Sequence, residues 1–181
     1  GDPLRSYKAD LYSADLTNVF AGSLAALNKQ VPDGPFCVKV GDEMAPLSVA
    51  ELRGSATGLA AFRAWLQTRV ASPADLGLTS FDQAQPLDQA DVKRADQARL
   101  RYLTAWFLQE RTALVYHHFT EACHLVWGDR AVTGTDVYYA AFPAKEDYFI
   151  ESRLGAFDQQ MHHFGSGDDA GIGARQTNTD L

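Results

Sequence analysis

Four side chains that can bind a metal or move a proton recur along one stretch of the chain: Glu110, His117, Glu121 and His124. In an α-helix, at about 100° per residue, these positions share a stripe about 60° wide. Glu and His three or four residues apart can hold one divalent metal or act as acid and base. The same spacing is also typical of a solvent-exposed helix edge carrying weak His–Glu pairs.

Residues 121–124 form a Glu-x-x-His unit, an element that carboxylate-bridged di-iron bundles use twice. The sequence offers no second copy, and Asp158 with His162 is the nearest substitute. A divalent ion takes about four to six ligands, of which one helix face supplies two or three. The metal hypothesis, with zinc or iron, therefore uses six residues: Glu110, His117, Glu121, His124, Asp158 and His162. The alternative that we favour uses no cofactor.

His118 lies in the centre of the apolar face of the same segment. A histidine there is usually a core residue bonded to a polar partner, but it can also line a ligand pocket between helices. The sequence has no Gly-x-Ser-x-Gly elbow, glycine-rich phosphate loop or His-Glu-x-x-His motif. We therefore favour a protein that is not an enzyme, with a small-ligand carrier that uses a pocket near His118 as one alternative.

Aromatic side chains gather in a stretch of low charge and define a candidate interface: Tyr138, Tyr139, Phe142 and Tyr148. Tyrosine is enriched at binding surfaces and is also common in cores, so both interpretations stay open. The two cysteines, Cys37 and Cys123, are either buried free thiols or one disulfide that closes a long loop.

Helices must position most of these residues. The chain reads as helical from Asp88 to residue 127 without a break, which predicts one long central helix. Ser13 is expected to cap a first helix, and Ser48 with Glu51 forms a capping box for a helix that extends to Val70, with a break near the glycines at 54 and 58. Apolar residues from Ile150 to Phe164 predict a last helix. Short strands are expected near 36–40 and 137–142, so the fold class is mainly α with minor β: a helical bundle around the central helix.

Composition limits the function further. The 181 residues include 16 Lys and Arg against 23 Asp and Glu, a net charge of −7 that argues against nucleic-acid binding. No apolar run is long enough for a membrane span. We expect one globular domain over 1–165 and a flexible, glycine-rich tail over 166–181.

The favoured function is a soluble, acidic binding domain of the inhibitor or immunity type, which engages a protein partner that is itself basic. The alternatives are a metal-dependent enzyme or metal carrier, and the small-ligand carrier. The first residue is Gly rather than Met, which favours a processed, periplasmic or secreted protein over a cytoplasmic one.

Overall fold

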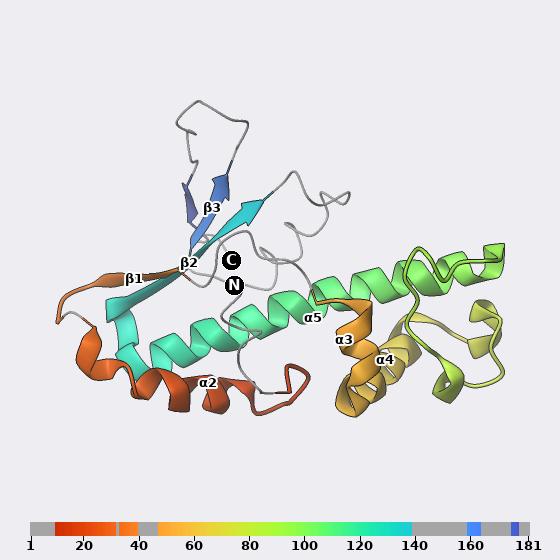
Figure 1. Cartoon of the computed structure of the whole chain (residues 1–181), viewed down its shortest axis with the longest axis horizontal. Helices are drawn as coiled ribbons and strands as arrows, with labels where there is room; N and C mark the ends of the chain where they lie inside the picture. The colour runs from red at the N-terminus through yellow and green to blue at the C-terminus, as the bar shows by residue number, and fades with distance from the viewer. Residues whose placement is uncertain (1–9, 32, 40–46, 139–158, 164–174, 178–181) are drawn as a thin grey trace. The chain divides into compact units, whose positions relative to one another are not determined.

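A computed structural model describes residues 10–31, 33–39, 47–138, 159–163 and 175–177 (Figure 1). The fold class is the expected one, mainly α with minor β, and it contains one long helix, α5 (Ala95–Trp127). Among the described helices, none has a run of apolar residues that could cross a bilayer. The chain divides into two compact units, and α5 passes from one to the other between Thr112 and Ala113. The expected domain boundary at residue 165 stays a prediction.

The first unit contains α2 (Leu16–Ala25), the short 3-10 helix η1 (Asn28–Gln30), the end of α5, the 3-10 helix η4 (Gly128–Arg130) and a sheet. The helix α2 begins three residues after Ser13, which was expected to cap it; Asp15 holds the N-cap position instead. The reason is a turn before the helix, in which the Ser13 amide donates to the Asp10 carbonyl at 2.9 Å. Leu16, Phe20 and Leu24 form the buried face of α2.

The sheet has the strand order β1 (Phe36–Lys39), β2 (Ala131–Tyr138), β3 (Gln159–His163) and β4 (Arg175–Thr177). β1 and β2 are parallel, β2 and β3 are parallel, and β3 and β4 are antiparallel. The strand expected at 36–40 is confirmed over Phe36–Lys39, and residue 40 lies outside the described part. The one expected at 137–142 begins earlier, at Ala131, and its residues 139–142 lie outside the described part.

The last helix, expected over 150–164, is wrong for residues 159–163, which form β3. β3 is hydrogen-bonded to strands on both sides, and this pairing overrides the helical spacing of Met161 with its neighbours. Residues 150–158 and residue 164 lie outside the described part. Residues 175–177, within the expected tail, form β4, and the flexibility expected for the tail stays a prediction.

The second unit contains residues 10–14, α3 (Val49–Gly54), α4 (Ala56–Arg69) and the first part of α5, with the 3-10 helices η2 (Pro73–Leu76) and η3 (Phe81–Gln83) between them. The capping box of Ser48 and Glu51 is confirmed. The expected break is also confirmed, because α3 ends at Gly54 and Ser55 caps α4 by accepting from the Gly58 amide at 2.9 Å.

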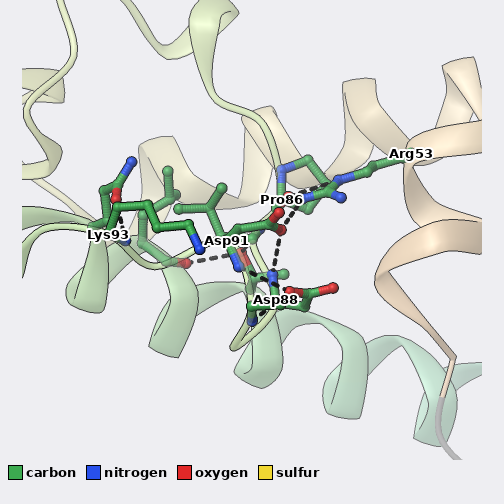
Figure 2. A network of polar contacts seen from close by, with 10 residues as sticks. Arg53, Pro86, Asp88, Asp91 and Lys93 are labelled. Carbon is green, nitrogen blue, oxygen red and sulfur yellow. Dashed lines mark hydrogen bonds and ion pairs between the residues drawn. The ribbon is translucent and has the colours of Figure 1, made fainter.

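The long helix begins at Ala95 and not at Asp88, because residues 88–91 form a turn of their own (Figure 2). The Asp88 carboxylate accepts from the Ala90 and Asp91 amides at 2.8 and 3.1 Å. The Asp91 carboxylate in turn accepts from the Asp88 amide and forms an ion pair with Arg53, whose guanidinium also donates to the Pro86 carbonyl. Asp88 therefore starts a turn, and Arg53 ties that turn to α3.

The core of the second unit surrounds Phe107 of α5. Its ring packs on Phe62 of α4 at 5.2 Å, on Trp65 at 5.6 Å and parallel to Tyr12 at 6.4 Å, measured between ring centroids. Tyr12 also lies against Gly58, where a Cβ atom would come within 2.8 Å of the tyrosine ring. Gly58 therefore allows α4 to approach Tyr12 closely. This core fixes the positions of α4 and α5 within the unit.

Candidate functional site

Three of the residues singled out in the sequence gather in the first unit around one carboxylate, that of Glu121. Its Oε1 lies 3.4 Å from Nε2 of His117, and its Oε2 lies 3.3 Å from Nδ1 of His118. Thr17 of α2 completes the group, because its hydroxyl donates to Oε2 of Glu121 at 3.0 Å and lies 2.9 Å from Nδ1 of His118. The structure therefore brings together Glu121, His117 and His118, and it adds a threonine that sequence reasoning had not considered.

These contacts change the acidity of Glu121. Its partial burial alone would raise the pKa, but the Thr17 hydrogen bond, the charge on His117 and the hydrogen bond and charge of His118 outweigh that effect. The net result is a pKa below the usual value, so the carboxylate is ionised at neutral pH. Glu121 is therefore held as an anion that accepts hydrogen bonds from its neighbours.

The geometry of this group does not match a nucleophile relay. In a Ser-His-Asp arrangement the hydroxyl and the carboxylate contact opposite nitrogens of the imidazole. Here Thr17 and Glu121 both contact Nδ1 of His118. The side chain of His118 is 19% exposed, and its contact with Thr17 joins α2 to α5. The ligand pocket near His118 stays a prediction.

The remaining proposed metal ligands come from other parts of the sequence. His124 is an exposed residue near the end of α5, His162 is in β3, and Asp158 lies outside the described part. Glu110 belongs to the second unit. Within the described residues, no three His, Cys, Asp or Glu side chains are grouped so that they could hold a metal. The six-residue metal site stays a prediction from the sequence.

The candidate interface and the cysteines have separate outcomes. Tyr138 is the last residue of β2, and Tyr139, Phe142 and Tyr148 lie outside the described part. Cys37 is exposed on β1 and Cys123 is buried on α5, and neither forms a disulfide. The structure therefore does not contain the candidate disulfide. It also does not bury both thiols, since Cys37 lies on the exposed face of β1.

A second group, which we call the Trp–Arg–Glu cluster, contains Trp65 and Arg69 of α4 and Trp106 and Glu110 of α5. The Glu110 carboxylate accepts from Nε1 of Trp65 at 2.6 Å and from Nε1 of Trp106 at 2.7 Å. The two indole rings meet edge to face, with their centroids 6.2 Å apart. One carboxylate thus fixes both half-buried tryptophans, neither of which was a candidate site residue in the sequence.

Arg69 completes the Trp–Arg–Glu cluster. Its Nη2 lies 3.1 and 3.4 Å from the two carboxylate oxygens of Glu110. The centre of its guanidinium lies 5.3 Å from the Trp65 centroid and 5.7 Å from that of Trp106, both within the range of a cation–π contact. Tyr102, one turn before Trp106, packs on the Trp106 ring at 5.9 Å and is 54% exposed. The cluster with Tyr102 is therefore an aromatic surface that contains one internal ion pair.

Helical spacing could have indicated this cluster. Tyr102, Trp106 and Glu110 follow one another at four-residue intervals, and Trp65 and Arg69 have the same interval on α4. Spacings of 7 and 11 residues placed Glu110 equally well on one helical stripe with His117 and Glu121, which favoured the metal hypothesis. The packing of α4 on α5 decides between the two alignments, because it brings Trp65 to the carboxylate that Trp106 contacts from the same helix.

Comparison of the chain with protein-family models, with characterised proteins and with solved structures finds no match in any of the three.

Proposed function

We propose that this chain is a non-catalytic binding domain whose Trp–Arg–Glu cluster, together with Tyr102, docks a protein partner. The observation that carries the proposal is the exposure of aromatic side chains beside an arginine: Tyr102 is 54% exposed, and Trp65 and Trp106 are half-buried. Trp, Tyr and Arg are the residues that most often dominate the binding energy of protein interfaces. Trp and Tyr supply large, rigid contact areas while only two side-chain torsions of each become fixed.

Pre-organisation of the surface supports the same function. Immobilising a flexible side chain on binding costs about 0.5–1.5 kcal/mol. Glu110 already fixes both indoles in the free protein, and Phe107 packs against the Trp65 ring from the core side. The two tryptophans therefore lose little freedom when a partner covers them, which favours affinity.

The charge of the chain indicates the kind of partner. With 23 acidic and 16 basic residues, the net charge of −7 attracts a basic protein over long range and raises its rate of association. We therefore propose a basic protein segment as the occupant. An inhibitor or immunity protein that covers a basic target in an exported compartment fits this description.

A random peptide display library, selected on the full chain, tests the proposal without knowledge of the natural partner. We expect the selected peptides to be basic and to lose at least about tenfold in affinity on Trp106→Ala, a difference of about 1.4 kcal/mol. Leu125→Ala is the matched control, because Leu125 is an apolar residue of the same helix that is 65% exposed.

Peptides that bind Trp106→Ala as tightly as the wild-type chain would contradict the proposal, as would a selection that enriches no sequence. Circular dichroism of both variants, measured before the binding assay, shows whether the helices are intact.

A further inference from the structure

We propose that the Trp–Arg–Glu cluster is a guanidinium-binding cage that Arg69 fills in the free protein, and that an arginine side chain of the partner replaces Arg69 on binding. This inference rests on the proposed function and adds to it the residue of the partner that is recognised. The juxtaposition that carries it is one carboxylate and two indoles surrounding a single arginine.

The walls of the cage offer a guanidinium the two interactions that it uses in proteins. The Glu110 carboxylate lies 3.1 Å from the bound nitrogen and supplies the anionic wall. The two indoles supply aromatic walls, with their centroids 5.3 and 5.7 Å from the guanidinium carbon. Because the two indole N–H groups donate to the same carboxylate, the anion and the aromatic walls keep their positions when the cation leaves.

The position of Arg69 suits an exchangeable occupant. It is the last residue of α4, and its side chain is 43% exposed. Its guanidinium contacts side chains: the carboxylate of Glu110 and the two indoles. Arg111, by contrast, donates to the backbone carbonyls of Leu11 and Ser13 at 2.7–3.2 Å and so fixes the path of the chain. Arg69 can therefore turn into solvent without breaking a backbone contact of that kind.

The chemistry of the cage favours arginine over lysine. A planar guanidinium can stack on an indole and donate to a carboxylate at the same time, whereas an ammonium is a compact and strongly hydrated charge. An incoming arginine also leaves the charge of the cage unchanged, because it pairs with Glu110 as Arg69 did. The exchange therefore costs an exposed ion pair and a cation–π contact and forms equivalent ones with the partner.

Tryptophan fluorescence of the full chain, titrated with N-acetyl-arginine amide, tests the inference. We expect Arg69→Ala to bind this probe about tenfold more tightly than the wild-type chain, the factor that an exposed ion pair and one cation–π contact together contribute. N-acetyl-lysine amide should bind at least about tenfold more weakly than the arginine probe. Arg94→Ala, which removes an exposed arginine outside the cage, should behave as the wild-type chain does.

The indole N–H signals of Trp65 and Trp106 in nitrogen–proton NMR spectra locate the probe and show that Arg69→Ala is folded. Equal affinity of the arginine probe for Arg69→Ala and Arg94→Ala would overturn the inference, as would shifts that spare both indole signals. Peptides from the display library separate the two proposals. A peptide that depends on Trp106 but keeps its affinity when its arginines are replaced by citrulline refutes the cage alone, because the docking surface would still stand.

Discussion

The stability effect of replacing Glu110 by glutamine can be predicted quantitatively, because the isosteric amide leaves the shape of the cluster unchanged. The carboxylate accepts from both indoles, one at each oxygen, and pairs with Arg69. An amide has one acceptor oxygen, and its NH₂ group would face an indole N–H, donor against donor. Loss of one charge-assisted hydrogen bond costs about 1.5 kcal/mol at the lower end of its range, and loss of the exposed ion pair about 0.5 kcal/mol.

Glu110→Gln should therefore lower the free energy of unfolding by about 2 kcal/mol. Urea unfolding followed by circular dichroism measures this change directly. The double variant with Trp106→Phe supplies the control, because the phenylalanine removes one indole donor and the conflict with the amide. Trp106→Phe should lower the free energy of unfolding by less in the Glu110→Gln variant than in the wild-type chain. A loss below about 0.5 kcal/mol for Glu110→Gln, or two strictly additive substitutions, would refute the view that this carboxylate holds both indoles.

Three further predictions concern the packing and the titrating groups around the sites. Gly58→Ala should destabilise the chain by about 1 kcal/mol, because the clash with Tyr12 exceeds the gain in helix propensity. Gly22→Ala on α2 should stabilise the chain by up to about 1 kcal/mol, because a Cβ atom there meets nothing within 4 Å. Thermal melts that rank the two variants in the opposite order would contradict this packing. Tyr12→Phe should stabilise the chain by about 1 kcal/mol, since the described residues supply no hydrogen-bond partner for the buried hydroxyl. Burial, above all, raises the pKa of Tyr12. The wild-type chain should therefore lose stability as pH rises above about 10.0, the pKa of tyrosine in the unfolded chain, and Tyr12→Phe should lack this loss. Equal melting temperatures of the two chains at alkaline pH would count against the raised pKa. Because the pKa of Glu121 is lowered in the folded chain, its carboxylate stabilises the fold at pH above the ordinary glutamate pKa of about 4.5, and this stabilisation is lost as pH falls through the folded pKa. Glu121→Gln should therefore reduce the dependence of stability on pH at acid pH, measured by urea unfolding. An unchanged dependence would count against the Thr17 and histidine contacts.

Local signals predicted the helical elements well. The capping box at Ser48 and the break after Gly54 depend on contacts within a few residues, so they could be predicted from the sequence and are confirmed. The continuity of α5 also follows from local propensity. Its start at Ala95 does not, because Asp88 and Asp91 can form either a helix N-terminus or a turn. The contact of Asp91 with Arg53, 38 positions away, accompanies the turn.

The remaining elements depend on partners that are distant in the sequence. Met161 continues the helical spacing of the apolar residues before it, yet residues 159–163 form a strand because β2 and β4 hydrogen-bond to it. Glu110 illustrates the same limit at the candidate site. Its neighbours on α5 suggested a metal ligand, whereas its hydrogen-bond partner Trp65 comes from α4, 45 positions earlier. Propensity along one helix cannot predict which side chain the next helix brings to it.

The central claim is that the Trp–Arg–Glu cluster with Tyr102 is the surface that binds a basic partner. Its most direct test is nitrogen–proton NMR of the full chain, titrated with a basic peptide from the display selection. We predict that the largest shifts fall on Trp65, Arg69, Tyr102 and Trp106, including both indole N–H signals. Shifts confined to residues around His117 and Glu121, with the indole signals unmoved, would contradict the claim and place the binding surface in the first unit.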